Sequence, residues 1–415
     1  MKVVHIISGE LSGGAARGAY WLHQSLRSKG IDSWILTNAQ DSRGDNYVVQ
    51  AQHTVASRII LSCKRRISRV AMTILGVPRD TLASSGFEGR NISGHPLVQG
   101  ADVVHLHWIN GFLSLSGVAS IEKPLIWTVR DMWPVSWGCH YEPELWKFGA
   151  DEKRYSASHN RRGEWARGSL ISAKRRHIPS HTIMVGISNW MTKFINQSPI
   201  GKHYRTECIL NGVNLKLFSA QPMAQARLRL NLPKDTPIIL VGAIQLEDRY
   251  KGLAELVAAL NGLKSKGAML VSFGRKSLCL DDTYLKSYIH LGEICDDKIL
   301  QDVYSSANVF VAPSIQEAFG KTVVESLSCG TPVVCFDSSG PAEIVRHKVT
   351  GYTAKLEDST DLADGIDYIL RLSSPDYLDF SSHAVSDMHD RYDVGLSAQK
   401  YINLYKEITT SDSQV

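Results

Sequence analysis

The stretch EAFGKTVVESLSCGTPVV, residues 317–334, holds two glutamates eight positions apart and ends in an apolar run. An apolar segment, ANVFVAPS (307–314), precedes it and has the composition of a buried strand. Residues 321–329 are expected to form about two helical turns, and Gly330 is the type of residue that ends a helix. Strand, loop, helix and a further strand in this order are typical of a parallel sheet covered by helices.

The same alternation runs through both halves of the chain. We expect strands at 2–8, 32–38, 102–108, 124–129, 182–188, 237–243, 269–274, 288–292, 307–314 and 331–336. Helices are predicted at 15–30 and 252–267, each ending at a glycine. A stretch rich in glycine and proline separates the halves near 195–235, whereas the pattern between 40 and 100 is irregular.

This pattern predicts two α/β domains, an N-terminal one at 1–200 and a C-terminal one at 201–385. The last segment, 386–415, is predicted to be helical and to return to the N-terminal domain. All nine tryptophans precede residue 191, so the two domains differ in composition and are expected to bind different ligands.

The composition is that of a soluble globular protein, with 43% apolar and 21% charged residues. Seven cysteines without a Cys-x-x-Cys pair argue against a disulfide framework and against a zinc cluster. No segment has the roughly 20 apolar residues that a membrane-spanning helix needs. The chain begins on a strand-like segment with no signal peptide before it, so we expect a cytoplasmic location.

Basic residues are concentrated in two places, although the net charge is only +5. Six lysines and arginines and no acidic residue lie between Arg58 and Arg79, interleaved with apolar residues, and a second basic block runs from Lys153 to Arg176. Such a segment is either a solvated helix face or a surface for anionic lipid at the inner face of the cell membrane. Nucleic acid is disfavoured, because no nucleic-acid-binding motif accompanies the charge.

A glycine-rich turn follows the first predicted strand, in SGELSGGAARGAYWL (8–22). Gly9, Gly13 and Gly14 bring the backbone to a helix start, where free N–H groups suit a phosphate or another anion. The spacing is not G-x-G-x-x-G, and the second strand ends in Asn38 rather than in an acidic residue. A nicotinamide-dependent dehydrogenase is therefore disfavoured.

The two glutamates of the opening stretch are expected in different places. Glu317 lies in the loop after a strand, where ligands of open α/β sheets bind. Glu325 lies about one turn into the helix, and a surface position is the alternative for it. The helix start between them offers N–H donors. This arrangement suits a ligand with a sugar, a diphosphate and a ribose.

These motifs resemble the signature of the retaining glycosyltransferases of family 4, which have the GT-B fold. The resemblance rests on PSIQEAFGKTVVESLSCGTPVV (313–334), GPAEIV (340–345), GYTA (351–354), ILNGVN (209–214) and VGAIQLEDRYKGL (241–253). It implies two Rossmann-like, doubly wound α/β domains that face each other across a cleft. It also implies transfer of a sugar from a nucleoside diphosphate donor, linked to uridine or guanosine, with no metal ion. Within the family the chain looks like the colanic-acid and capsule type, which builds cell-surface polysaccharide.

The resemblance also assigns roles to residues. Glu317 would hold the donor sugar, Lys251 the diphosphate and Glu325 the ribose. The full donor-binding set implied is Gly13, Gly14, Arg249, Lys251, Glu317, Phe319, Gly320, Lys321, Thr322 and Glu325. The catalytic set implied is Glu317, Lys251, Arg130 and Asp131. The residues expected to bind the acceptor are His107, Trp108, Asn110 and Trp133.

Two positions depart from the family pattern. Arg130, in WTVRDMWPVSWGCHY (127–141), stands where a related subgroup has histidine, and an arginine cannot act as a base. Ala243 stands near the place of a usual arginine, which Arg249 is expected to replace. The leading hypothesis is transfer to a glycan or lipid-linked glycan. A non-catalytic partner subunit, or an epimerase or phosphorylase on the same fold, is the alternative.

Overall fold

The computed structural model of the chain describes residues 1–11, 13–40, 44–52, 55–74, 83–141, 161–242, 248–265, 267–278 and 287–411. The chain forms two compact units, the first made of Met1–Gly212 with Val394–Val415 and the second of Val213–Asp393. It therefore passes between the units twice, after Gly212 and after Asp393. The boundaries expected from the sequence lie a short distance before these two passages.

The first unit is built on a seven-stranded parallel sheet with the order β3-β2-β1-β4-β5-β6-β7. Its strands are β1 (Lys2–Ile7), β2 (Asp32–Thr37), β3 (Val48–Gln50), β4 (Val103–Leu106), β5 (Leu125–Val129), β6 (Ile183–Gly186) and β7 (Thr206–Cys208). Strands β4 and β5 are buried along their whole length. Helices cover both faces of such a sheet, which is why these strands are largely apolar in sequence, with His105 and Thr128 as the polar residues in them.

One helix of the first unit covers most of the basic stretch 58–79, for which a solvated helix face was one of the two interpretations. The helices of this unit are α1 (Gly14–Ser28), α2 (Val55–Ile74), α3 (Pro96–Gln99), α4 (Leu115–Ala119), α5 (Arg161–His177), α6 (Asn189–Gln197) and α14 (Val394–Ser411), with short 3₁₀ turns at η1 (Trp133–Val135) and η3 (Gly201–His203). Helix α2 lies in the stretch that seemed irregular. It buries few residues, Leu61, Ser68 and Met72 among them, so its apolar residues do not mark one buried stripe.

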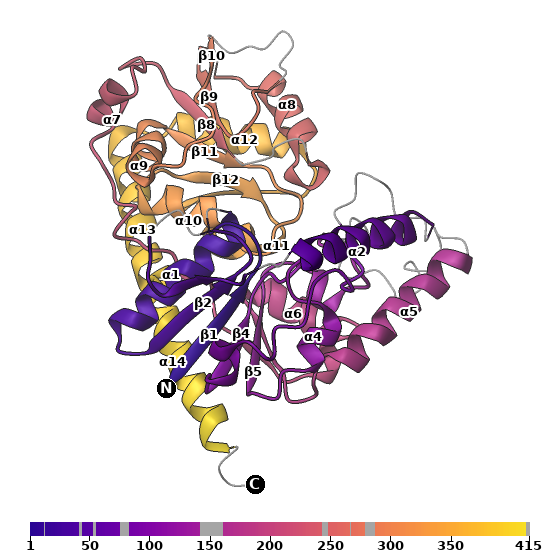
Figure 1. Cartoon of the computed structure of the whole chain (residues 1–415). Coiled ribbons are helices and arrows are strands. Elements are labelled where there is room, and N and C mark those ends of the chain that lie inside the picture. Colours follow the sequence, from indigo (N-terminus) through magenta and orange to yellow (C-terminus); the bar gives the residue numbers. More distant parts are fainter. Residues whose placement is uncertain are drawn as a thin grey trace. The chain divides into compact units, whose positions relative to one another are not determined.

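The C-terminal helix α14 completes the core of the first unit. It lies beside α1 (Figure 1) and brings Tyr401, Ile402 and Tyr405 into a cluster with Leu22, Leu26 and residues of four strands. Three polar contacts reinforce the packing, because Tyr405 and Tyr401 bond to His105 and Thr128 and the Ser397 hydroxyl donates to the Leu210 carbonyl. The 18 residues of α14 thus pack against the sheet of the first unit.

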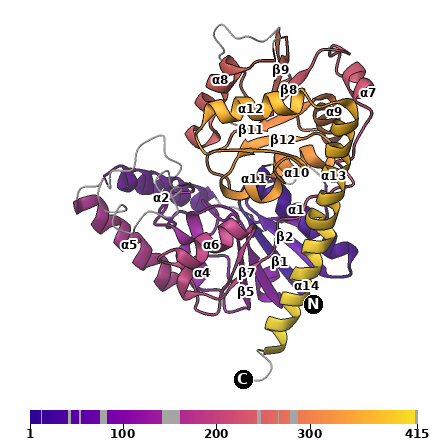
Figure 2. The same cartoon turned by 180° about the vertical axis from the view of Figure 1, so that it is seen from behind.

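The second unit holds a six-stranded parallel sheet with the order β10-β9-β8-β11-β12-β13. Its strands are β8 (Ile238–Gly242), β9 (Met269–Phe273), β10 (Ser287–His290), β11 (Val309–Ala312), β12 (Val333–Phe336) and β13 (Gly351–Ala354). Its helices are α7 (Met223–Arg229), η4 (Arg249–Lys251), α8 (Leu253–Gly262), α9 (Asp297–Ser306), α10 (Lys321–Ser328), α11 (Ser339–Ile344), α12 (Ser359–Leu370) and α13 (Ser374–Tyr392). Helices α8 and α12 lie on one face of the sheet, and α9 and α10 on the other (Figures 1 and 2).

In each sheet the strand order reverses once, between β1 and β4 in the first unit and between β8 and β11 in the second. Two loops leave the carboxyl ends of the strands at such a point and run to opposite faces, which opens a crevice for ligands. The loops of the first unit contain the glycine turn after β1 and the segment after β4. Those of the second contain Lys251 and Glu317.

The strands predicted from the sequence are confirmed, with ends that differ by a few residues. The predicted helix at 252–267 ends earlier, at Gly262, because the next residue, Leu263, has an extended backbone. The predicted end of α10 is confirmed, since Gly330 has φ +77°, a left-handed conformation that favours glycine. Within the described part of the chain, no helix is long and apolar enough to cross a membrane.

Candidate active site

Glu317 and Lys251 form an ion pair where the strand order of the second unit reverses. Glu317 lies in the loop between β11 and α10, and Lys251 ends the 3₁₀ turn η4 after β8. Lys251 Nζ donates to Glu317 Oε2 at 3.1 Å, and the Ser314 hydroxyl donates to the same oxygen at 3.0 Å. Both partners remain partly exposed, at 16% and 22% of their side chains. The pair is therefore fixed in position yet open to a ligand.

Backbone contacts hold these two loops together. The amides of Ile315 and Gln316 both donate to the carbonyl of Tyr250, next to Lys251. Gly252 has φ +69°, and a Cβ there would lie 1.9 Å from the carbonyl oxygen of Pro313. Only glycine allows this approach. Contacts between the two backbones thus place Lys251 beside Glu317, although the two residues are 66 positions apart in sequence.

The start of α10 follows directly on Glu317. Gly320 caps the helix with φ +107°, and no side chain bonds to the first N–H groups. Lys321 and Thr322 are partly exposed, whereas the Phe319 ring is buried against Tyr392. The helix start therefore offers backbone donors and a positive dipole end to an anion.

Glu325 is buried in the second unit, which excludes the surface position considered for it. Only 1% of its side chain is exposed. The Tyr304 hydroxyl donates to Oε2 at 2.9 Å, and Lys321 Nζ lies 3.3 Å from Oε1, which accepts no hydrogen bond among the described residues. Lys321 gives this oxygen an ion-pair partner, and Oε1 keeps unused hydrogen-bonding capacity inside the unit.

The structure describes Arg249, which was expected to replace the arginine that the family usually has near the place of Ala243. Arg249 is exposed on η4, and its side chain forms no hydrogen bond or ion pair with the described residues. Ala243 lies outside the described residues. The role of Arg249 at the diphosphate stays a prediction.

In the first unit, Gly13 and Gly14 lie at the start of α1, after β1. Gly13 is the N-cap and makes no side-chain cap bond, and a Cβ at either position would meet no atom within 4 Å. Neighbouring protein atoms therefore do not require these glycines. The space that they leave is available to a ligand that approaches the helix start.

Asp131 is the centre of a buried hydrogen-bond cluster. Its Oδ2 accepts from Trp108 Nε1 at 2.9 Å and lies 2.6 Å from His140 Nδ1, while its Oδ1 accepts from the Trp133 amide. His140 Nε2 lies 2.6 Å from Asn110 Nδ2. Since Nδ1–H donates to the carboxylate, Nε2 of a neutral ring accepts from the amide. Three residues expected to bind the acceptor thus contact one carboxylate or its histidine.

Sequence reasoning missed two residues of this region, His140 and Lys174. Lys174, on α5, is 1% exposed and donates to the carbonyls of Trp133 and Ser136, with its Nζ 3.9 Å from the centre of the Trp133 ring. Trp133 itself is 2% exposed. His140 could have been considered, because it lies in the same segment, 127–141, as Arg130 and Asp131. Nothing in the sequence connects Lys174 with Trp133.

Arg130 and His107 are joined by a hydrogen bond inside the first unit. Arg130 Nε donates to His107 Nδ1 at 3.2 Å, and Arg130 Nη1 donates to Asn211 Oδ1 at 3.0 Å. Because an arginine N–H can only donate, His107 Nδ1 carries no proton, and in the neutral ring Nε2 carries it. His107 Nε2 then donates to His5 Nδ1 at 2.8 Å, which leaves the proton of His5 on Nε2.

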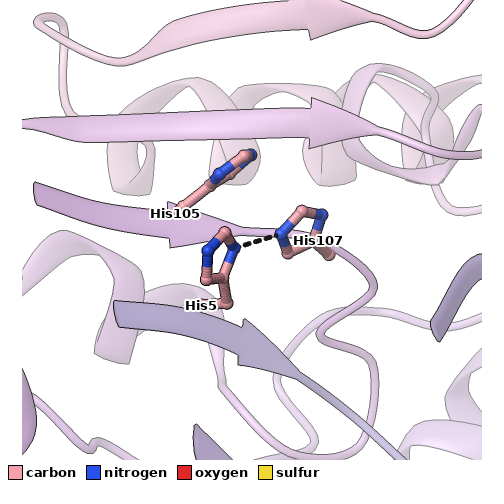
Figure 3. A group of neighbouring side chains, drawn as sticks. All are labelled: His5, His105 and His107. Atoms are coloured by element: carbon pink, nitrogen blue, oxygen red, sulfur yellow. Dashed lines mark hydrogen bonds between the residues drawn. The ribbon is translucent and has the colours of Figure 1, made fainter. Parts of the chain in front are cut away.

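His5, His105 and His107 form a buried cluster (Figure 3), in which His5 lies on β1 and His105 is its register partner on β4. Their ligand atoms lie within 4.8 Å of one another, so a metal ion has to be considered. Among the described residues, however, every ring nitrogen except His5 Nε2 already has a partner. A metal would break these bonds beside the Arg130 cation, so the cluster fits a hydrogen-bond network better.

Burial lowers the pKa of the histidines in this network. Desolvation is the largest cause for His5, His105 and His107, and their pKa values fall well below the ordinary 6.5. Neighbouring histidines and Arg130 lower them further. All three rings are therefore neutral at physiological pH, as the chain of hydrogen bonds requires.

Solved structures identify the class of fold. The chain resembles sucrose-phosphate synthase of Thermosynechococcus elongatus with TM-score 0.68 and 18% identity, over 99% of this chain and 100% of that one. HepE of Anabaena, solved with UDP and glucose, matches with TM-score 0.63 and 16% identity over 98% and 99%. WaaG, a glycosyltransferase involved in lipopolysaccharide biosynthesis, matches with TM-score 0.62 and 14% identity over 97% and 99%. These likenesses confirm the predicted GT-B fold.

Sequence comparison then identifies the family of the second unit. Residues 225–384 match the family Glycosyl transferases group 1. D-inositol 3-phosphate glycosyltransferase of Thermobispora bispora is 29% identical over 218 residues, which are 49% of this chain and 50% of that protein. An N-acetylgalactosaminyltransferase of Campylobacter jejuni that acts on diacetylbacillosaminyl-diphospho-undecaprenol is 28% identical over 52% and 60%. The chain thus spans half to three-fifths of the length of these curated relatives. The match over residues 225–384 confirms the resemblance to glycosyltransferases that the motifs of the second unit suggested.

Proposed function

We propose that the protein is a retaining glycosyltransferase, which transfers a sugar from a nucleoside diphosphate donor to a glycan or lipid-linked glycan. The observation that carries this proposal is the Lys251–Glu317 pair where the strand order of the second unit reverses, beside the start of α10. The Glu317 carboxylate suits a sugar, and Glu325 suits a ribose. The cations and the backbone donors at the start of α10 suit a diphosphate.

Each residue has a separate role in the proposal. Glu317 holds hydroxyls of the donor sugar, and Lys251 stabilises the charge that develops on the departing diphosphate. Lys251 and the backbone at the start of α10 act together on the phosphates, with Arg249 as a further contact. A role of Gly13 and Gly14 in donor binding stays a prediction. Glu325 Oε1 accepts from the ribose. Transfer is proposed to need no metal ion.

The acceptor is proposed to be a glycan of the cell surface, of the lipopolysaccharide or capsule kind. Two of the relatives are named for a phosphorylated inositol and for an undecaprenyl diphosphate-linked sugar. Trp108 and Asn110 are half-buried near the carboxyl end of β4 and are the proposed acceptor contacts. Asp131 is proposed to fix Trp108 and, through His140, Asn110. A role for Trp133 at the acceptor stays a prediction.

Nucleotide binding tests the proposal directly. A panel of uridine and guanosine diphosphates and their sugars, with adenosine diphosphate as control, is expected to give one base that stabilises the protein. At a concentration of about 100 times Kd, binding adds about 2.7 kcal/mol to the unfolding free energy. Differential scanning calorimetry measures the shift. Stabilisation without turnover of any donor would favour the non-catalytic partner subunit, and no stabilisation would contradict both.

Attachment to the inner face of the cell membrane is a second part of the proposal, and α2 carries it. Ile59, Ile60, Ile67 and Val70 are 60%, 56%, 69% and 59% exposed. At about 100° per residue they share the side of α2 opposite Leu61, Ser68 and Met72, which are buried. Arg66 and Arg69 are exposed beside them. The further residues at 75–82, with Arg79, and the start of the second basic block lie outside the described residues.

Liposome flotation tests this attachment. Binding to vesicles that contain anionic lipid is expected for the wild type and is expected to weaken about tenfold or more in the double variant Ile59→Asp/Ile67→Asp. Leu228→Asp is the matched control, because Leu228 is an equally apolar side chain, 77% exposed, in the second unit. Equal flotation of the two variants would remove α2 from the proposal.

A further inference from the structure

Arg130 is a buried cation without an anionic partner among the described residues. Its side chain is 8% exposed, and its two hydrogen bonds go to neutral acceptors, His107 Nδ1 and Asn211 Oδ1. The neighbouring carboxylate of Asp131 is already bonded to Trp108, His140 and the Trp133 amide. Nη2 makes no bond with the described residues.

Such an arrangement is expensive for the folded protein. A guanidinium taken out of water loses its hydration, and neutral acceptors replace only part of it. Burial lowers the pKa of Arg130 to about 10, so the group still carries its charge at physiological pH. A charge that is retained at this cost and without a counterion is a site that a negatively charged ligand would complete.

The surroundings hold the guanidinium in one orientation. His107 receives Nε and is itself fixed by its bond to His5, while Asn211 receives Nη1. Gly18 of α1 lies against Nη1, and a Cβ there would come within 2.9 Å of it. The glycine thus makes room for the guanidinium, and the two histidines are positioning residues whose neutral form the bond requires.

We propose that Arg130 is the centre of an anion-binding site in the first unit, which takes a carboxylate or phosphate group of a substrate. The planar group, whose Nη2 makes no hydrogen bond with the described residues, is suited to the paired oxygens of either anion. This inference rests on the proposed function and adds the substrate class, because it requires a negative charge at a position where the related subgroup has histidine. The charge comes either from the donor diphosphate or from an acidic sugar or phosphorylated acceptor.

The test compares Arg130→Gln with Arg176→Gln, which removes an exposed arginine of α5. Melting of the first unit is followed by tryptophan fluorescence, because all nine tryptophans precede residue 191. The probes are inorganic phosphate and glucuronate, each at an ionic strength matched with chloride. Both are expected to stabilise the wild type and Arg176→Gln, with apparent affinity about tenfold or more weaker in Arg130→Gln.

Two further arms separate the sources of the charge. If the donor diphosphate binds Arg130, the Kd of UDP or GDP rises about tenfold in Arg130→Gln, and phosphate adds nothing to the nucleotide-saturated wild type. If an acidic acceptor binds there, nucleotide affinity is unchanged, and glucuronate or phosphate still stabilises the saturated wild type but not the variant. A wild type that binds no nucleotide would refute the proposed function, while the phosphate arm would still decide on Arg130.

Equal responses of Arg130→Gln and Arg176→Gln to every probe would overturn the site, as would a wild type that no probe stabilises. The ligand-free Arg130→Gln protein is expected to be at least as stable as the wild type, since it loses an uncompensated buried charge. Should it fail to fold, Arg130→Lys takes its place. Lysine keeps the charge without the planar group, so several-fold weaker binding is expected, and unchanged binding would count against the proposal.

Discussion

Glu317→Gln is expected to lower sugar transfer at least about a hundredfold, mainly through kcat. The glutamine keeps the size of the side chain but removes the charge that Lys251 Nζ and the Ser314 hydroxyl contact. In the proposed function this carboxylate orients hydroxyls of the donor sugar at the reacting carbon. Its loss also frees Lys251 from the position in which it meets the departing diphosphate. Steady-state transfer, or donor hydrolysis where no acceptor is at hand, measures the effect.

Stability separates this effect from a folding defect. The Lys251–Glu317 pair is partly exposed, so removing it should change the unfolding free energy by about 1 kcal/mol or less. Glu293→Gln is the matched control, because Glu293 pairs with Arg275 at a side chain that is 43% exposed on the same unit. Turnover within a factor of three of the wild type in Glu317→Gln would remove Glu317 from the catalytic site.

The sequence predicts the position of Glu317 well because that position depends on local patterns. An apolar strand, a loop and a helix closed by Gly330 place the residue at the carboxyl end of β11. That Lys251 meets it follows from one further rule, since β8 and β11 are neighbours at the reversal of strand order. The burial of Glu325 does not follow from either rule, because it depends on Tyr304 of α9 packing against α10.

Contacts between distant segments are what the sequence did not predict. The C-terminal segment was expected to return to the N-terminal domain, but no pattern in the sequence indicates that Tyr405 of α14 meets His105 across 300 residues. Lys174 reaches Trp133 from α5, and neither residue carries a pattern that points to the other. The sequence therefore does not distinguish an exposed aromatic residue that could contact a sugar from a buried one such as Trp133, which is 2% exposed.

A helix face was one interpretation of the basic stretch 58–79, but the extent of helix α2 was not predicted. A helix is recognised in sequence by apolar residues that recur on one buried face. In α2 the large apolar residues Ile59, Ile60, Ile67 and Val70 are exposed, and the buried side includes Ser68. Because apolar residues lie on two faces of this helix, their spacing in the sequence does not follow the helical period. The exposed face is the one proposed to meet the membrane.

The stability of the first unit is expected to fall steeply with acid, by about 5 kcal/mol for each pH unit near pH 5.5. His5, His105 and His107 have pKa values well below 6.5, mainly because of burial, and burial lowers the pKa of His23 to about 4. In the unfolded chain each titrates near its ordinary pKa of about 6.5. Between these values the unfolded state binds protons that the folded state excludes, so acid favours unfolding.

Urea unfolding followed by tryptophan fluorescence, at several values between about pH 7.5 and pH 5, measures this slope for the first unit alone. The fluorescence reports on the first unit because all nine tryptophans precede residue 191. A fully excluded proton contributes about 1.4 kcal/mol per pH unit, so four histidines bring a domain of ordinary stability close to unfolding within two or three units. The protonation of His107 would also remove the acceptor that holds Arg130 Nε.

A single substitution tests whether the histidines are the cause. His23→Gln removes one of the four groups and is expected to reduce the slope by about a quarter, whereas His181→Gln, at an exposed position, is expected to leave it unchanged. A slope in the wild type that corresponds to one proton or fewer would mean that the buried rings accept protons in the folded state. The neutral chain from Arg130 through His107 to His5 would then be wrong, and with it the orientation of the guanidinium toward a ligand.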